Sequence, residues 1–374
     1  MYSKPISVHL THAPADQQIK RNGKTLVEQV HDKCPTLADP HKAIYRPSAH
    51  MSSGHLQTIY LSTRHSKPSG YPVNYKREVF RFADGGETAI DWSLPREGVT
   101  PDQPLIILLS GIAGGSYNYF VRSFVHLISQ QPYGYQVAVL HCRGCNGVDL
   151  VTPKSFHSGM TEDLREFMNY LGKVKPGTPT IGVGFSLGAN ILTKYMGEEG
   201  ENCPFIAAIS VCNPFDINTI MDLLSKPSFK NRYVYAAALT KKLVKGFVQN
   251  QEVIMAGQTN LDAEKIVAAR TMNEFNEAYA AKVFGFESAK ELNINSSSVH
   301  YLKSIKVPTL FINALNDPIC DKSTIPYDEI VKNPYLLLAR TKYGGHLAYF
   351  EGLGLKPWLP LRMAQFLQAM VDWK

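Results

Sequence analysis

The sequence predicts an α/β protein with a mostly parallel, doubly wound sheet, an antiparallel N-terminal edge and an inserted helical cap. Short apolar runs without polar alternation recur along the chain, as is typical of parallel strands that are covered on both faces. Helix-forming segments fall between several of these runs, and a long, mainly helical segment separates two of them. We expect residues 1–40 to be an irregular arm with room for one strand, and residues 41–374 to form one domain with the cap at about 217–300.

The antiparallel edge is predicted from a hairpin. Residues 77–82 and 88–94 are β-prone runs, and the turn sequence Ala-Asp-Gly-Gly between them is a strong hairpin signal. The parallel strands are expected in the apolar runs at residues 105–109, 136–140, 180–184, 205–211, 309–314 and 335–339.

Helices are expected at residues 120–130, 161–171, 187–197 and 359–371. The second of these begins with acidic residues, which complement the dipole of a first helical turn. The interval between the strands ending near residue 211 and starting near residue 309 is too long for a simple crossover. Because residues 223–281 within it are mainly helical in pattern, this interval is predicted to be the cap.

The charge pattern excludes some classes of partner. The formal net charge is +7 over 374 residues, and the basic residues are scattered rather than gathered in a stripe, so we expect no nucleic-acid partner. No polybasic run lies beside an amphipathic helix, which leaves attraction to anionic membranes permitted but not required. Every apolar stretch is shorter than the roughly 20 residues of a membrane-spanning helix, so none is expected.

The six cysteines are widely spaced except for the pair Cys142 and Cys145. Together with the lack of a signal-peptide pattern, this spacing predicts a reducing intracellular compartment, the cytoplasm. The pair has no second pair to complete a zinc site and precedes no helix of the thioredoxin kind, so we expect no metal. No cofactor is expected either, because the chain has no phosphate-binding or dinucleotide-binding glycine fingerprint.

The pentapeptide Gly-Phe-Ser-Leu-Gly at residues 184–188 directly follows a predicted strand and precedes a predicted helix. In this setting a G-x-S-x-G sequence forms the sharp turn that exposes a nucleophilic serine, because small residues on either side accept the strained backbone and the close packing. We therefore predict that Ser186 is a covalent nucleophile.

A serine hydroxyl needs a base to take its proton and an acid to orient that base. Asp317 follows the strand at 309–314, and His346 lies in a Gly-Gly-His loop after the strand at 335–339. Asp321 is a rival acid, and the other histidines are rival bases, although none of them follows the last strand. The order Ser, Asp, His is the one that α/β-hydrolases use.

Stabilisation of an oxyanion requires two backbone N–H groups. One comes from the residue after the nucleophile, Leu187, and the other from the loop after the strand at 105–109. That loop reads Ser-Gly-Ile-Ala-Gly-Gly at residues 110–115, so Ile112 is the predicted second donor.

The chain resembles the YheT-like branch of the α/β-hydrolases, and most closely the fungal medium-chain fatty-acid ethyl ester synthase/esterases. The similarity covers roughly Tyr45 to the end. It is carried by the motifs SGHLQT at 53–58, RGC at 143–145, GEEG at 197–200, CNPFD at 212–216, the cap signature at 270–275 and 285–286, and GGHLAY at 344–349. Ser110 departs from the family, which usually has histidine there. Mammalian relatives begin with a membrane anchor, and we expect none here.

The resemblance implies an α/β-hydrolase fold and a serine esterase or lipase that cleaves medium-chain acyl esters. Acyl-CoA is a further acyl donor, and water or an alcohol is the acceptor, the latter giving ethyl ester synthesis. The alternatives within the family are a monoacylglycerol lipase or a phospholipase, and the remote alternative is a non-catalytic binding protein. The resemblance also implies peripheral association with membranes, at lipid droplets or the mitochondrial outer membrane. The residues themselves indicate an apolar acyl pocket below the cap.

Overall fold

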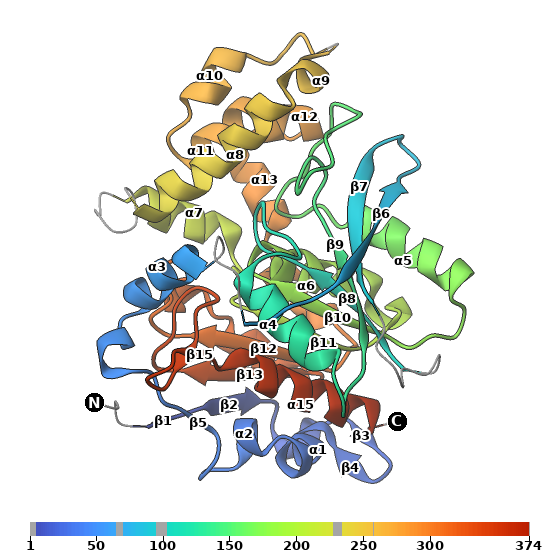
Figure 1. The fold of residues 1–374 in the computed structure, drawn as a ribbon, viewed down its shortest axis with the longest axis vertical. Coiled ribbons are helices and arrows are strands. Elements are labelled where there is room, and N and C mark those ends of the chain that lie inside the picture. Colours follow the sequence, from blue (N-terminus) through green and yellow to red (C-terminus); the bar gives the residue numbers. More distant parts are fainter. Residues whose placement is uncertain (1–4, 65–69, 95–102, 227–233, 257, 374) are drawn as a thin grey trace.

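The structure, a computed structural model, describes residues 5–64, 70–94, 103–226, 234–256 and 258–373. Within these residues, one large sheet runs through the molecule in the order β2-β13-β12-β11-β10-β8-β9-β7-β6 (Figure 1). Its strands are β2 (His9–His12), β6 (Tyr75–Arg81), β7 (Glu87–Ser93), β8 (Leu105–Leu109), β9 (Gln136–Leu140), β10 (Thr180–Phe185), β11 (Phe205–Val211), β12 (Thr309–Ala314) and β13 (Leu336–Thr341).

The predicted fold class is confirmed. Strands β8 to β13 pair in parallel, and β6 and β7 form the predicted antiparallel hairpin beside β9. The strand bounds agree with the apolar runs to within two residues at either end. Within a strand buried on both faces, every side chain can be apolar, which is why these runs lack polar alternation.

Helices cover both faces of the sheet (Figure 1). Successive side chains of a strand point to opposite faces. Thus Ile106 and Leu108 of β8 pack with one hydrophobic cluster, and Ile107 packs with the other. The first face carries α1 (Leu26–Lys33), α4 (Tyr119–Ile128) and α15 (Leu359–Val371), and the second carries α5 (Glu162–Val174) and α6 (Leu187–Glu199).

The first forty residues are more regular than the irregular arm that was predicted. Strand β2 extends the sheet by pairing antiparallel with β13, and α1 packs against α15. Thr25 caps α1 through a reciprocal pair of hydrogen bonds with Glu28, and Leu26 and Val30 are fully buried. These elements are only four and eight residues long, so their apolar periodicity is too short to recognise without the sheet and helix that they contact.

Short elements complete the framework. They are β1 (Ile6–Ser7), β3 (Lys20–Arg21), β4 (Lys24–Thr25), β5 (Ile44–Tyr45), β14 (Phe350–Glu351), β15 (Lys356–Pro357), α2 (Pro35–Ala38), α3 (Gly54–Arg64) and α14 (Tyr327–Lys332). Turns of 3₁₀-helix are η1 (Ala15–Gln17), η2 (Ala49–Met51), η3 (Gly200–Asn202), η6 (Ser298–Ser304) and η7 (Lys322–Thr324).

A helical region lies between β11 and β12, above one end of the sheet in Figure 1. It contains α7 (Ile217–Ser225), α8 (Ala237–Gln249), α9 (Gln251–Met255), α10 (Ala263–Ala268), α11 (Met272–Phe275), the π-helical turn η5 (Asn276–Ala280), α12 (Ala281–Phe284) and α13 (Ala289–Ser296). Residues 227–233 and 257 of the predicted cap lie outside the described residues. Two small apolar clusters hold this region together and join it to the rest of the domain through Leu150 and Cys320.

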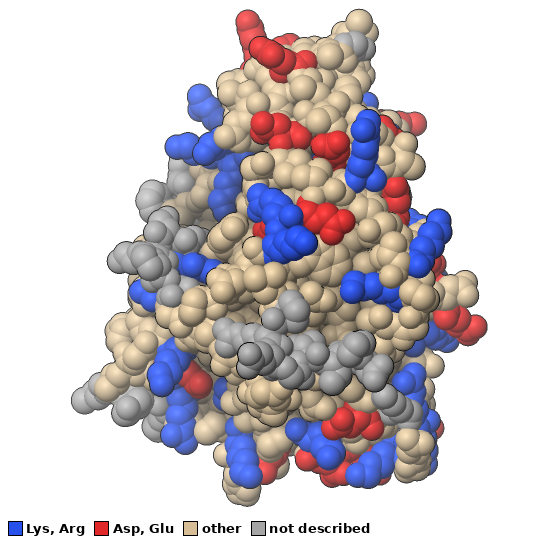
Figure 2. Space-filling model, turned by 45° about the vertical axis from the view of Figure 1, so that its right-hand side comes forward, with Lys and Arg blue, Asp and Glu red and all other residues tan. Residues whose placement is uncertain are grey.

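Two surface properties bear on the expected partners. Basic and acidic side chains are interspersed among uncharged ones on the face shown in Figure 2. In the part of the chain that the structure describes, no helix combines the length and apolar character needed to cross a membrane.

Candidate active site

The G-x-S-x-G turn joins β10 to α6, and its serine has a strained backbone. Ser186 has φ 53° and ψ −116°, a conformation that non-glycine residues rarely adopt. The flanking glycines permit the turn: a Cβ on Gly184 would lie 2.5 Å from Cα of Ala189, and one on Gly188 would lie 2.3 Å from the carbonyl oxygen of Leu109. Only glycine therefore fits at residues 184 and 188, where β10 and α6 pack closely. This packing holds Ser186 in its strained conformation.

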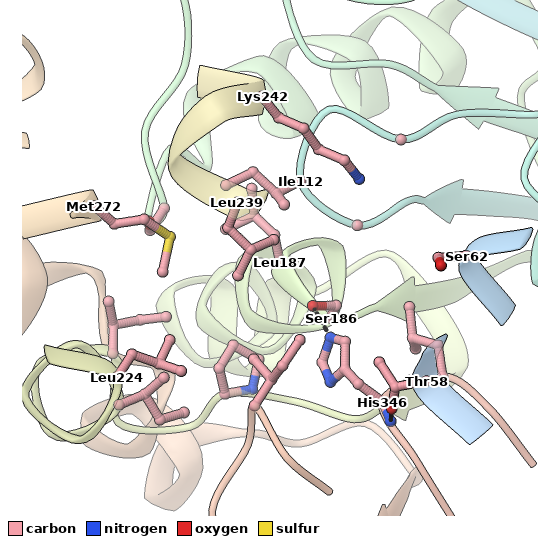
Figure 3. A pocket seen from close by; sticks show the side chains of 18 of the residues that line it. Thr58, Ser62, Ile112, Ser186, Leu187, Leu224, Leu239, Lys242, Met272 and His346 are labelled. Atoms are coloured by element: carbon pink, nitrogen blue, oxygen red, sulfur yellow. Dashed lines mark hydrogen bonds between the residues drawn. The ribbon is translucent and has the colours of Figure 1, made fainter. Parts of the chain in front are cut away.

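The structure brings the three residues of the predicted triad into one hydrogen-bonded line. Oγ of Ser186 lies 2.6 Å from Nε2 of His346 (Figure 3), and Nδ1 of His346 lies 2.9 Å from Oδ2 of Asp317. The Asp317 side chain is fully buried, and that of His346 is 9% exposed. An imidazole that donates from Nδ1 to a carboxylate keeps Nε2 free to accept a proton, so this arrangement can activate a hydroxyl.

Asp317 is held by the backbone that follows it. Its Oδ1 accepts hydrogen bonds from the N–H groups of Ile319, at 2.8 Å, and Cys320, at 3.0 Å. These bonds leave Oδ2 directed at the imidazole. The rival acid Asp321 is engaged elsewhere, since its carboxylate caps η7 by accepting from the N–H of Ser323.

The motif at residues 53–58 supports the histidine loop, a role that was not predicted. Oγ1 of Thr58 accepts a hydrogen bond from the N–H of His346 at 2.9 Å and donates to the carbonyl of Gly54 at 2.7 Å. A Cβ on Gly54 would lie 2.0 Å from the carbonyl oxygen of Asn316, the residue before the acid. Helix α3 therefore contacts both loops that carry the acid and the base. The motif at 53–58 was visible in the sequence, but the residues that it contacts, Asn316 and His346, are more than 250 residues further along the chain.

The loop with the predicted oxyanion donor is fixed by side chains on either side of it. The N–H of Gly115 and the hydroxyl of Ser110 both donate to Oδ1 of Asn118, and Nδ2 of Asn146 donates to the carbonyl of Gly114 at 2.7 Å. These contacts hold the loop with serine at position 110, where the family usually has histidine. Ile112 and Leu187 both line the cleft that contains Ser186 (Figure 3).

A cleft opens above the serine between the sheet and the helical region, with an empty volume of about 1010 Å³ that is partly open to solvent. Four of its apolar lining residues come from α7, and the others come from several different segments. These residues are Leu61, Ile112, Phe120, Leu187, Pro214, Ile217, Ile220, Met221, Leu224, Leu239, Met272, Ile319 and Leu347. The cleft can therefore remove an acyl chain from water.

One group of potential metal ligands occurs among the described residues. Cys212, Asp317 and His346 place ligand atoms within 4.8 Å of one another. However, His346 and Asp317 already bond each other, and burial raises the pKa of the Cys212 thiol well above its usual range. A protonated thiol is a poor ligand, so this group suits the hydrogen-bonded line rather than a metal ion.

Comparison with known proteins places the fold. The family described as alpha/beta hydrolase fold matches residues 104–353. Two curated proteins of Saccharomyces cerevisiae are each 30% identical to this chain. One is a monoacylglycerol lipase, with 93% of this chain and 85% of that protein covered. The other is medium-chain fatty acid ethyl ester synthase/esterase 2, with 85% and 83% covered. Among solved structures, an esterase of Pyrococcus furiosus has a TM-score of 0.51 at 16% identity, covering 82% of this chain and 96% of that one.

Proposed function

Because this chain belongs to the α/β-hydrolase family, we propose that it is a serine esterase that cleaves medium-chain acyl esters. The observation that carries the proposal is the line of hydrogen bonds from Ser186 through His346 to Asp317 at the foot of an apolar cleft. A binding protein without chemistry has no need of a strained serine in contact with an oriented imidazole.

In the proposed first step, Oγ of Ser186 attacks the ester carbonyl while Nε2 of His346 takes its proton. Asp317 stabilises the imidazolium that forms, and the N–H groups of Leu187 and Ile112 donate to the oxyanion of the tetrahedral intermediate. The intermediate collapses when His346 returns the proton to the leaving oxygen. The products of this step are an alcohol and an acyl-enzyme on Ser186.

In the second step, His346 removes a proton from a water molecule, which attacks the acyl-enzyme. Collapse of the second tetrahedral intermediate releases the fatty acid and returns the proton to Oγ of Ser186. Replacing water by an alcohol gives an ester instead of an acid, with the same proton transfers. The two outcomes differ only in which acceptor reaches the acyl-enzyme.

A series of p-nitrophenyl esters from acetate to palmitate tests the proposed substrate class. We expect kcat/KM to rise from acetate to a maximum at medium-chain esters, because each methylene buried in the cleft contributes about 0.8 kcal/mol until the apolar wall is filled. Beyond that length the rate should fall. Lack of turnover at every chain length would contradict the esterase proposal and favour a binding protein. The same assay with 1-octanoylglycerol tests monoacylglycerol hydrolysis, which the name of one relative supports.

Transfer to alcohol is part of the proposal because one relative is named an ethyl ester synthase as well as an esterase. With octanoyl-CoA in dilute ethanol, we expect both free octanoate and ethyl octanoate to form. The ratio of ethyl octanoate to free octanoate should rise with ethanol concentration. Gas chromatography of the products measures this ratio. If ethyl octanoate does not exceed the uncatalysed background, the acceptor is water alone.

We propose that the protein is intracellular and associates peripherally with a lipid surface, such as a lipid droplet or the mitochondrial outer membrane. Support comes from α3, where Leu56 is 50% exposed and Ile59 is 46% exposed. Thr58 and Leu61 of the same helix line the cleft. An apolar helix surface beside the cleft would bring the site to substrates that partition into lipid.

A further inference from the structure

Lys242 is a basic residue in an otherwise apolar part of the cleft. It lies on α8 and lines the cleft together with Leu239 of the same helix. Figure 3 shows its side chain extending from α8, with the ammonium directed to the side of the cleft away from Leu224. The residue as a whole is exposed, but desolvation of the part of its side chain at the cleft lowers the pKa of the ammonium. An anion bound in the cleft beside this ammonium would replace the hydration that the ammonium loses there.

No protein group supplies that anion among the described residues. The ion pairs and hydrogen bonds between them include none to Lys242, and burial is the one cause that lowers its pKa, with no carboxylate opposing it. The described lining of the cleft contains no acidic residue. Asp317 lies behind the imidazole of His346, with its side chain fully buried. The open space beside the serine therefore favours a negative charge.

The direction of the Lys242 side chain indicates which part of a substrate carries this charge. The apolar wall of α7, which includes Leu224, is the surface that an acyl chain can cover. With the chain on that side and the carbonyl at Ser186, the leaving group extends to the opposite side, where Figure 3 places the Lys242 ammonium. The carboxylate of a fatty-acid product would lie at Ser186 instead. Acyl donors whose leaving group is anionic commonly carry phosphate, which offers several acceptor oxygens to an ammonium.

We propose that Lys242 is a specificity-determining residue that forms an ion pair with a phosphate on the leaving group of the acyl donor. This inference rests on the proposed esterase function and extends it. It means that the cleft prefers phosphate-bearing acyl donors over neutral donors with the same acyl chain. A phospholipid headgroup and coenzyme A both supply such a phosphate.

Two matched pairs of octanoyl donors test the inference. The first pair is 1-octanoylglycerol 3-phosphate and 1-octanoylglycerol, and the second is octanoyl-CoA and S-octanoyl-N-acetylcysteamine. Each pair has one acyl chain and one type of scissile bond, and only one member carries phosphate. In Lys242→Gln, the ratio of kcat/KM for the charged donor to that for its neutral partner should fall about tenfold, the lower end expected for a hydrogen bond to a charged group in a partly exposed site. Lys242→Arg should keep most of the ratio.

Lys241→Gln is the matched control, because both lysines are exposed on α8 and Lys241 does not line the cleft. A fall confined to the glycerol pair identifies a lipid headgroup, and a fall confined to the thioester pair identifies coenzyme A. Ratios that stay constant in both pairs, or that fall equally in Lys241→Gln, would overturn the inference. If the wild-type protein turns over none of the four donors, the esterase proposal itself fails, which is a distinct result.

Discussion

Replacing Ser186 by alanine is expected to lower kcat for p-nitrophenyl octanoate by about 10⁵- to 10⁶-fold and to abolish covalent labelling by a fluorophosphonate probe. The reason is that Oγ of Ser186 is the atom in contact with Nε2 of His346, at 2.6 Å, and no acyl-enzyme can form without it. Alanine suits the turn as well as serine does, since both carry a Cβ at φ 53°. The thermal unfolding midpoint should therefore stay close to that of the wild type.

Ser158→Ala is the control for this experiment. Ser158 also lines the cleft, but it lies outside the hydrogen-bonded line through His346. It should keep fluorophosphonate labelling, because a hydroxyl without a base in contact is a poor nucleophile. Labelling that persists in Ser186→Ala would remove Ser186 from the proposed role, and the labelled peptide would identify the residue that replaces it.

The parts of the fold that could be predicted are those whose signal is local. Strand β8 is five apolar residues in a row, and β6 and β7 are joined by a recognisable hairpin turn. The first forty residues were predicted as irregular because β2 acquires its partner from β13, more than 300 residues away. Pairing with β13 at the edge of the sheet stabilises this short, partly exposed strand, and its four residues alone do not indicate that pairing.

The candidate site likewise has one part that the sequence predicts and another part that it does not. Ser186, Asp317 and His346 could be predicted from their order and from the strands that precede them, and the structure brings them together. The supporting contacts could not, because they join segments that are apart in the sequence: Thr58 accepts a hydrogen bond from the N–H of His346, and Asn146 donates one to the carbonyl of Gly114. A motif can mark such residues as unusual, but only the packing of α3 against the two loops gives them a role.

Replacing Asp317 by asparagine is expected to lower kcat by about 10⁴-fold with little change in KM. Oδ1 of Asp317 accepts from two backbone N–H groups, of Ile319 and Cys320. In the variant, the amide oxygen must take that place, because an NH₂ group cannot accept. The NH₂ group then faces Nδ1 of His346, which must become an acceptor, so the imidazole proton moves to Nε2. An imidazole with its proton on Nε2 cannot take the proton of Ser186, although every side chain stays in position.

The comparison with Asp321→Asn makes this argument specific to one carboxylate. Asp321 lies four residues away and caps η7, so its loss should leave kcat within about twofold and lower stability by about 1 kcal/mol at most. Both variants are compared by steady-state hydrolysis of p-nitrophenyl octanoate and by thermal unfolding. A wrong histidine tautomer lowers kcat without lowering stability, whereas loss of the cap on η7 lowers stability without lowering kcat. A large loss of kcat in Asp321→Asn, with near-normal turnover in Asp317→Asn, would assign the acid to the rival residue. Such an outcome would mean that the 2.9 Å contact between Asp317 and His346 orients the loop without serving the reaction.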